Sequence, residues 1–530
     1  MSEKSPITMP PKVVARHTPT MSEATLTNDK IDEKCYSKET ESLHLDLGKV
    51  IDVEAQAQSQ RKPKLFASTR YAILTLYRRL FTLVFCANVA MFVYVMSTEQ
   101  KLLALVNATA ANLLACGLAR QPLVVNAIFV VVCSMPRSAP LLLRRIAAKV
   151  YHYGGVHSGC GVASLVWYVG FVGVLSHQYW NPSADGPDIG VSAAPVALAY
   201  VILVLLLAII VVAHPAFRMK RHDYFELTHR FSGWLVVALF VALLLVFSRG
   251  ASRSMGQPFG TFLIELPAFW FLMFTVAAII QPWLFLRKVA VRAEPLSTHA
   301  TRLHFDHAIT TFGKGIQLAK HPLRDWHGFA TFPDPAPAGV HGGPSFSSLV
   351  SKAGDWTADT IQNPPTHLWK RGVLIYGFAY AMRVFRRVIV VTTGSGIGPC
   401  LSFLGDDNRP ALRVLWQTRA PRTTYGDGVM HMVHKMDDAP IILDTNKCGR
   451  MDMVPIILQQ IKHFDAEAVC VISNPKSLYL LSILPYILSG LWRLLAVHCF
   501  FIPIDIFEGC SVAILLFRGA PCLCTYISAS

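Results

Sequence analysis

A glycine-rich turn that directly follows an apolar run has the residue spacing of a ligand-binding site. Residues Arg387–Pro399 read Arg-Val-Ile-Val-Val-Thr-Thr-Gly-Ser-Gly-Ile-Gly-Pro, which predicts a buried strand, a turn and the start of a helix. Gly394 and Gly396 would let the backbone approach a pyrophosphate, whose charge a helix amino terminus stabilises. A lone glycine-rich turn is often an ordinary tight turn, so its surroundings must decide.

The residues after this turn predict an alternating α/β layout. Further strands are expected at 412–417, 440–443 and 468–473, with a helix at 453–464. The glycine turn then follows the first strand, where nucleotide sites form. Arg419 and Arg422 come after the second strand, followed by Tyr425, and this basic pair could hold a 2′-phosphate, favouring NADPH over NADH. The alternative that these are solvated loop charges stays open.

Histidines near apolar runs raise a second chemistry, the ligation of haem iron. The candidates are His152, His157, His177, His214, His222 and His229. A two-haem relay needs histidines about thirteen or fourteen residues apart on each of two helices. That step leads from His157 to Gly170 or Phe171, and from His229 to Ala242 or Leu243, none of which ligates iron. We predict interfacial histidines and no metal site, with haem disfavoured and one haem between His157 and His229 left open.

Composition indicates a membrane protein. Hydrophobic residues make up 53%, charged residues 15%, and the mean hydropathy is +0.41, whereas soluble proteins carry about 25% charged residues. The net charge of +16 comes from Lys and Arg beside apolar runs, which favours topology signals over nucleic-acid binding. The 12 cysteines include no paired CxxC cluster, so neither a disulfide framework nor a zinc site is expected.

Six apolar runs are long enough to cross a bilayer. They lie near 80–97, 102–119, 158–177, 195–213, 231–248 and 261–284, and a shorter run at 123–135 predicts an interfacial or re-entrant piece. Basic residues are frequent before the first run, between the second and third, between the fourth and fifth, and after the sixth, whereas 178–194 has none. This alternation predicts a multi-pass protein with both termini cytosolic, in the plasma membrane or an endomembrane.

The predicted fold class is therefore a polytopic α-helical membrane domain, a small antiparallel β-barrel that would bind FAD, and an α/β nucleotide-binding domain. The barrel is expected from short strand patterns at 301–307, 316–320, 325–331 and 346–357, with a Gly313-Lys-Gly315 turn. The predicted divisions are a disordered cytosolic tail at 1–70, membrane helices at 71–290, the barrel at 291–386, the α/β domain at 387–478 and an atypical apolar tail at 479–530.

Taken together, these motifs resemble the ferric reductase/NADPH oxidase superfamily. Gly354-Asp-Trp-Thr357 is similar to its flavin-phosphate segment, His327-Gly-Phe-Ala-Thr331 to its flavin motif with Gly328 in place of a proline, and Gly394–Pro399 to its nicotinamide loop. Tyr151–Gly161, His229–Trp234 and Ser351–Thr357 look closest to the fungal TmpA-type integral membrane flavoproteins, which also lack the full haem ligand set.

The resemblance implies cofactor-binding residues. His327, Phe329 and Thr331 would contact the flavin ring and its phosphate end; Lys352, Gly354, Asp355, Trp356 and Thr357 would line the FAD phosphates; Gly394, Gly396, Gly398 and Pro399 would face NADPH or NADH; and Arg419 and Tyr425 would lie near the 2′-phosphate. Asn474 stands where many relatives carry a cysteine beside the nicotinamide, and the apolar tail departs further, as read-through of an intron or a misjoined exon would.

These features predict an oxidoreductase that passes hydride from NAD(P)H to FAD and then to a small organic acceptor. The expected partners are the lipid bilayer and that acceptor, with no nucleic acid. Two alternatives remain: a haem-dependent transmembrane ferric reductase or NADPH oxidase, and a non-catalytic membrane scaffold or sensor. The residues name neither the acceptor nor the product, nor the oligomeric state.

Overall fold

The computed structural model describes residues 76–98, 102–181, 192–334, 345–406, 408–473, 511–516 and 523–525. All of them belong to one compact unit, Lys62–Ser530. The predicted disordered tail at 1–70 and Asn474 lie outside the described residues, as does most of the apolar tail.

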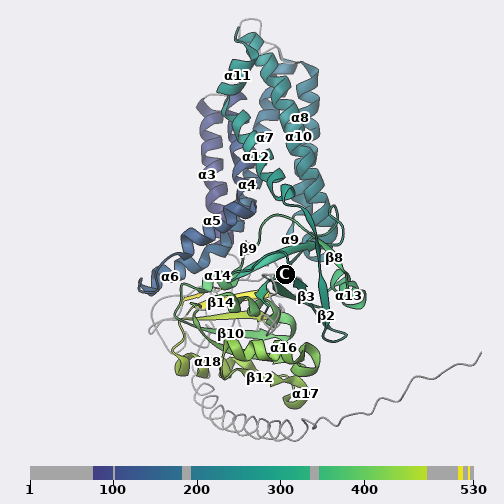
Figure 1. Ribbon diagram of the computed structural model, residues 1–530. Helices are drawn as coiled ribbons and strands as arrows, with labels where there is room; N and C mark the ends of the chain where they lie inside the picture. Colours follow the sequence, from purple (N-terminus) through teal and green to yellow (C-terminus); the bar gives the residue numbers. More distant parts are fainter. Residues whose placement is uncertain are drawn as a thin grey trace, which may run out of the picture. The chain divides into compact units, whose positions relative to one another are not determined.

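The amino-terminal part is a helical bundle (Figure 1). Its elements are α3 (Leu76–Thr98), α4 (Leu102–Leu118), α5 (Pro122–Cys133), α6 (Leu141–Ala147), a 3₁₀ turn η1 (Ala148–Tyr153), α7 (Gly154–Trp180), α8 (Ala193–Val212), α9 (Pro215–Lys220), α10 (His222–Ser254), α11 (Phe259–Glu265) and α12 (Pro267–Leu284). Helix α7 packs against α3, α4 and α8, and α12 packs against α4 and α10.

Five of the described helices are long and apolar enough to cross a membrane, or up to six if a bent pair counts as one span. The bent pair is α4 and α5, whose axes differ by 72°. Gln121 lies at the bend, where its side chain accepts a hydrogen bond from the Val124 N–H (2.8 Å), and Pro122 opens α5. The short run expected at 123–135 is therefore a helix that turns away from the helix before it.

Two antiparallel sheets follow. The first has the order β1-β8-β4-β5, with β9 paired to β4, and the second has the order β2-β3-β7-β6. Their strands are β1 (Arg287–Ala290), β2 (Arg292–Pro295), β3 (Ala300–Phe305), β4 (Lys314–Ala319), β5 (His327–Ala330), β6 (Phe332–Pro333), β7 (Phe346–Ser351), β8 (His367–Lys370) and β9 (Ile375–Tyr376). Leu303, Phe305, Ile316, Leu318 and Val350 form the core between them.

The last part is a six-stranded sheet with the order β12-β11-β10-β13-β14-β15. Strands β10 (Arg387–Thr393), β11 (Ala411–Thr418), β12 (Ile441–Asp444) and β13 (Ala468–Ser473) are parallel. Strands β14 (Ser511–Leu516) and β15 (Leu523–Thr525) are antiparallel. The apolar tail thus supplies strands that extend the α/β sheet.

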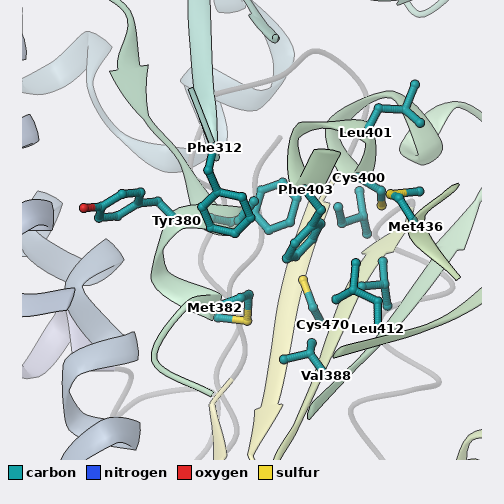
Figure 2. Packing of buried hydrophobic residues seen from close by; sticks show 14 of the residues in the cluster. Phe312, Tyr380, Met382, Val388, Cys400, Leu401, Phe403, Leu412, Met436 and Cys470 are labelled. Atoms are coloured by element: carbon teal, nitrogen blue, oxygen red, sulfur yellow. The ribbon is translucent and has the colours of Figure 1, made fainter. Parts of the chain in front are cut away.

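Helices cover this sheet and complete a shared core. They are α14 (Phe378–Met382), α15 (Ile397–Cys400) between the 3₁₀ turns η2 (Gly394–Gly396) and η3 (Leu401–Gly405), α16 (Pro421–Met436), α17 (Thr445–Cys448) and α18 (Met453–Phe464). Figure 2 shows Phe403, Val388, Leu412 and Cys470 packed together, with Phe312 and Tyr380 beside them. The strands are buried on both faces, as parallel strands require.

Two expectations need correction. The strand pattern at 346–357 ends at Ser351, because Asp355 opens a helix, α13 (Asp355–Gln362). The helix expected to start after the glycine turn is α15, which is short and lies between the 3₁₀ turns η2 and η3. Strand β1 starts at Arg287, before the expected boundary at 291, because it pairs with β8.

Candidate functional site

The order of the parallel strands reverses at β10. Strand β10 has β11 on one side and β13 on the other, and the chain leaves β10 for β11 before it returns to β13. In open α/β sheets, ligands bind at the carboxyl ends of the strands at such a switch point. Thr393 ends β10 and Ser473 ends β13, and their hydroxyl oxygens are 2.5 Å apart. The Gly394–Pro399 turn begins at this point.

Two contacts fix the glycine turn. Gly394 has a φ of +50°, which favours glycine, and its carbonyl accepts a hydrogen bond from Trp416 Nε1 at 3.0 Å. A Cβ on Gly396 would lie 2.4 Å from Thr392 Oγ1 and 2.8 Å from the Ile472 carbonyl oxygen. No other residue fits there, whereas a Cβ at Gly394 would meet open space. One side of the turn is closed by the sheet and the other is open.

The turn also joins the two halves of the expected site. Helix α15 packs against β5 and β7 of the antiparallel sheets. A Cβ on Gly398 would lie 3.4 Å from Leu349 Cβ on β7. The predicted nicotinamide loop and the strand of the predicted flavin motif are therefore neighbours.

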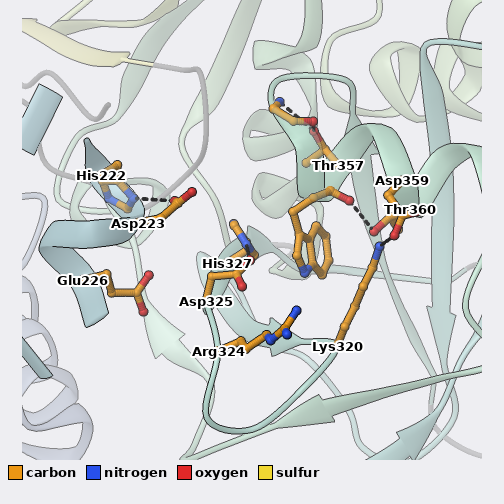
Figure 3. A network of polar contacts seen from close by, with 12 residues as sticks. His222, Asp223, Glu226, Lys320, Arg324, Asp325, His327, Thr357, Asp359 and Thr360 are labelled. Atoms are coloured by element: carbon orange, nitrogen blue, oxygen red, sulfur yellow. Dashed lines mark hydrogen bonds and ion pairs between the residues drawn. The ribbon is translucent and has the colours of Figure 1, made fainter. Parts of the chain in front are cut away.

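The flavin motif lies on β5 and stacks on α13. The His327 ring is 4.5 Å from the Trp356 ring, and the Phe329 ring is 5.5 Å from it. All three side chains are buried, so they build the core beneath the site. His327 Nε2 donates to Asp325 Oδ2 at 2.6 Å, and this hydrogen bond lowers the pKa of Asp325 (Figure 3).

The amino end of α13 presents polar groups to solvent. Lys352, Gly354 and Asp355 are exposed. Thr357 is buried and its hydroxyl accepts the N–H of Gly354 at 2.9 Å, so it caps the turn. Lys320 pairs with Asp359 on this helix (Figure 3). Thr331 is buried too, and its hydroxyl donates to the Lys314 carbonyl at 3.0 Å.

Four buried polar atoms in these segments have no hydrogen-bond partner among the described residues. They are Ser348 Oγ, Ser351 Oγ, Trp356 Nε1 and Thr392 Oγ1. Such atoms are rare in folded proteins and often mark a site for water or a ligand. Neither serine nor Thr392 can be singled out from the sequence, because single hydroxyls within strand patterns carry no signal of their own.

The two residues expected near a 2′-phosphate lie in different settings. Arg419 is exposed just after β11. Tyr425 is only 1% exposed, and its ring packs 5.2 Å from the Trp416 ring. Tyr425 therefore packs against Trp416, whose indole N–H donates a hydrogen bond to the Gly394 carbonyl. Arg422 is exposed and lies 3.4 Å from Asp427.

The helical part holds the loop that leads into β5. Arg230 on α10 donates to the Arg324 carbonyl at 2.7 Å. Trp283 on α12 packs edge-on against Trp326 at 6.1 Å. Arg371 lies over Trp326, with its guanidinium carbon 4.4 Å from the ring centre, and burial lowers its pKa to about 10.

His157 and His229 lie close together at one end of the bundle, but no histidine stands at the positions that a second haem would need. The rings of His157 and His229 are 6.2 Å apart. His157 Nδ1 is 2.9 Å from the Cys116 carbonyl oxygen. Phe171 and Leu243 line one apolar cavity of about 10 Å³, which is far too small for a porphyrin. The residues present do not fit a second haem there, and no cluster of three or more metal-ligating residues occurs among the described residues.

Comparison with known proteins gives relatives that carry the word reductase. Residues 378–479 match the family model "Adenylate-forming reductase 03009, C-terminal domain". Adenylate-forming reductase 03009 of Coprinopsis cinerea is 41% identical over 412 residues, covering 78% of this chain and 39% of that protein. Adenylate-forming reductase 06235 of the same fungus is 39% identical over 424 residues, covering 80% and 40%. This chain spans about two-fifths of both relatives.

Solved structures resemble parts of the chain only loosely. A ferredoxin-NADP⁺ reductase mutant from Plasmodium falciparum with 2′P-AMP covers 38% of this chain and 90% of its own, at 13% identity and a TM-score of 0.29. Flavohemoglobin from Malassezia yamatoensis covers 71% and 94%, at 12% identity and a TM-score of 0.31. At TM-scores this low, the solved structures support no conclusion about the site. The TmpA type within the ferric reductase superfamily stays a prediction.

Proposed function

We propose that this chain is an NAD(P)H-dependent flavoprotein oxidoreductase of a membrane. One observation carries the proposal: the Gly394–Pro399 turn lies at the switch point of a parallel sheet and packs against β5 and β7. This arrangement would bring a nucleotide at the turn close to a flavin held by the antiparallel sheets. The names of the fungal relatives agree with a reductase.

The residues fit the two cofactors in distinct ways. The exposed turn at Lys352–Asp355, with the first-turn amides of α13, would hold the FAD phosphates. Gly394 would bring its backbone to the NAD(P)H pyrophosphate, and Arg419 would select NADPH through its 2′-phosphate. His327, Phe329 and Trp356 would support the flavin from below as a rigid stack.

The bound cofactors would supply hydride transfer from the nicotinamide to the flavin. The protein would supply position and exclusion of water. No general acid is needed for that half-reaction, so the perturbed pKa of Asp325 indicates a structural link to His327 and not a proton donor.

Electrons would leave on the cytosolic side to a small organic acceptor. The loop before β5 contacts α10 and α12, so an acceptor at the inner leaflet could approach the flavin there. The absence of distal ligands at Phe171 and Leu243 supports this route over a transmembrane haem relay.

The visible spectrum of the chain, purified in detergent with FAD supplied, tests the proposal. We expect a flavin band that bleaches when NADPH is added without oxygen. Colourless protein that releases all FAD on gel filtration would instead support the scaffold or sensor.

A single haem at the bundle's lower end is a second candidate. The 6.2 Å between the His157 and His229 ring centres favours it. A haem absorption band that His229→Ala abolishes would establish it, and a spectrum with flavin alone would remove it.

A further inference from the structure

A cavity with two arginines in its lining lies away from the proposed nucleotide site, between the bundle and the α/β part. It has a volume of about 300 Å³ and is lined by Cys133, Ser134, Met135, Pro136, Arg137, Arg383 and Asn408. Small-molecule sites range from about 300 to 1,000 Å³, so this cavity can take a head group or a small phosphorylated molecule.

The cavity lies at the opposite end of β10 from the glycine turn. Arg383 comes just before β10 begins at Arg387, whereas the glycine turn follows Thr393. Seven strand residues at about 3.3 Å each separate the two ends by roughly 20 Å. A ligand in the cavity is therefore not the proposed nucleotide.

Two guanidinium groups line the cavity, and neither has an ion-pair partner among the described residues. Arg137 is held by Arg383 and Asn408: its Nε donates to the Arg383 carbonyl at 3.0 Å, and Nη1 donates to Asn408 Oδ1 at 3.2 Å. Arg383 lies over the Tyr380 ring, with its guanidinium carbon 4.8 Å from the centre. A third arginine, Arg386, donates to the Arg137 carbonyl at 3.2 Å.

Two carboxylates lie near the cavity, and each already accepts hydrogen bonds from the protein. Glu467 receives two hydrogen bonds from Arg144, at 2.6 and 2.8 Å. Asp406 accepts the Asn408 N–H at 2.8 Å. Burial, and after it the charge of Arg383, lowers the pKa of Arg137, although the charges of Asp406 and Glu467 act in the opposite direction.

Apolar side chains flank the cavity on both sides. Val130 and Val131 on α5 are exposed, and so are Leu142, Leu143 and Ile146 on α6. Basic groups beside exposed apolar side chains are typical of surfaces that meet anionic lipid.

We propose that the Arg137–Arg383 cavity binds a phosphate group, with an anionic phospholipid head group as its favoured source. Arginine pairs suit phosphate oxygens because the planar guanidinium donates two parallel hydrogen bonds. A soluble phosphorylated molecule would offer the same group, so the test has an arm for each source.

The lipid arm counts lipids bound to the full chain by native mass spectrometry in detergent. Phosphatidic acid is compared with phosphatidylcholine for the wild type, Arg383→Gln, Arg383→Lys and Arg387→Gln. Arg387 is a matched control because it is exposed and paired with Asp465 outside the cavity. We expect Arg383→Gln to weaken phosphatidic acid binding about tenfold, Arg383→Lys to keep most of it, and Arg387→Gln to change nothing.

The soluble arm measures the thermal shift that inorganic phosphate gives the same variants. Loss of this shift in Arg383→Gln, with unchanged lipid counts, would support the phosphate site with a soluble source. Equal lipid counts and equal shifts in the wild type and Arg383→Gln would overturn the proposal. Arg383→Gln leaves the hydrogen bond from Arg137 to the Arg383 carbonyl in place. Arg383→Lys shows whether a loss of binding comes from the lost charge or from a folding defect.

Discussion

Thr392 and Gly396 lie in close contact within the proposed nucleotide site. Thr392 Oγ1 occupies the space where a Cβ on residue 396 would stand. The hydroxyl is buried and has no hydrogen-bond partner among the described residues. The glycine is therefore required by the sheet that supports it, as well as by any ligand.

Gly396→Ala should disturb this point directly. Because the methyl group would meet Thr392 and the Ile472 carbonyl, the turn must shift. Overpacking costs about 1–3 kcal/mol, so we expect NADPH binding to weaken about tenfold or more while FAD stays bound. Titration of NADPH against flavin fluorescence measures this. Gly233→Ala on α10 is the control, since its Cβ meets nothing within 4 Å; equal affinities would contradict the placement.

A buried cluster of charged side chains in the second sheet should determine how the stability of the fold changes at low pH. Asp334 contacts Arg302 at 2.5 Å and His304 Nδ1 at 2.8 Å. Burial raises the pKa of Asp334, but hydrogen bonds from His304 and Ser347 and the charge of Arg302 outweigh it, so the pKa lies below its usual value.

The sign of the pH effect follows. A carboxyl whose pKa is lowered by folding stabilises the fold fully above about pH 5, and this contribution disappears as the pH falls toward the lowered pKa. We expect the melting temperature to drop steeply below about pH 4 in the wild type and less steeply in Asp334→Asn.

At neutral pH Asp334→Asn should cost about 3 kcal/mol, because Arg302 would lose its buried partner. Asp427→Asn is the control: its pair with Arg422 is exposed and should contribute under about 1 kcal/mol. Parallel pH profiles for the wild type and Asp334→Asn would refute the assignment.

At the scale of elements, α13 and β5 depend on each other. Trp356 of α13 is stacked on His327 and Phe329 of β5, with Lys320 over its ring at 5.3 Å. The helix is only 8 residues long, so packing must hold it in place more than its own helix propensity.

Trp356→Ala should therefore cost about 3–5 kcal/mol and release FAD. Trp356→Phe keeps an aromatic ring in the stack and should retain most of the bound FAD. Thermal unfolding and the flavin content after gel filtration measure both effects. Full FAD content in a folded Trp356→Ala protein would exclude this stack as the support of the flavin.

The elements differ in how far the sequence predicts them. The amphipathic run at 453–464 predicts α18 to the residue, and the apolar runs predict β10, β11 and β13 closely. The sequence does not predict helix α16, because Gly426, at φ +77°, interrupts its helical pattern. Tyr425, expected near the 2′-phosphate, is buried in the core, and residue type alone does not predict whether a tyrosine is buried.

The candidate site was predictable where glycine spacing carries the signal. Gly394 and Gly396 fall at the switch point, as the spacing predicts. The contact of Gly398 with Leu349 was not predictable, because it joins segments far apart in the chain. The unpartnered hydroxyls of Ser348 and Thr392 likewise appear only once both sheets are assembled.

At the scale of the molecule, the bundle is bound to both sheet regions. Arg144 on α6 pairs with Glu467 just before β13, and Arg230 on α10 donates to the loop before β5. Both arginines lie at the same end of the bundle as the proposed cytosolic face. If the bundle crosses a membrane as proposed, these contacts would hold both sheet regions on the proposed cytosolic side.

This orientation predicts opposite labelling of the two faces. In intact cells a membrane-impermeant maleimide should label Gln257→Cys, in the loop between α10 and α11, but not the wild-type chain. The exposed native Cys448 should react only after the membrane is permeabilised. Labelling of Cys448 in intact cells would contradict the proposed orientation.

The central claim is that a nicotinamide at the glycine turn reaches a flavin supported by β5 and α13. The most direct test mixes FAD-loaded protein with NADPH without oxygen and follows the flavin absorption, using NADPH with hydrogen or deuterium at the transferred position. The account predicts bleaching that is slower with deuterium in the wild type and severely slowed in Gly396→Ala. A bound flavin that NADPH leaves oxidised, with NADH equally inert, would contradict it.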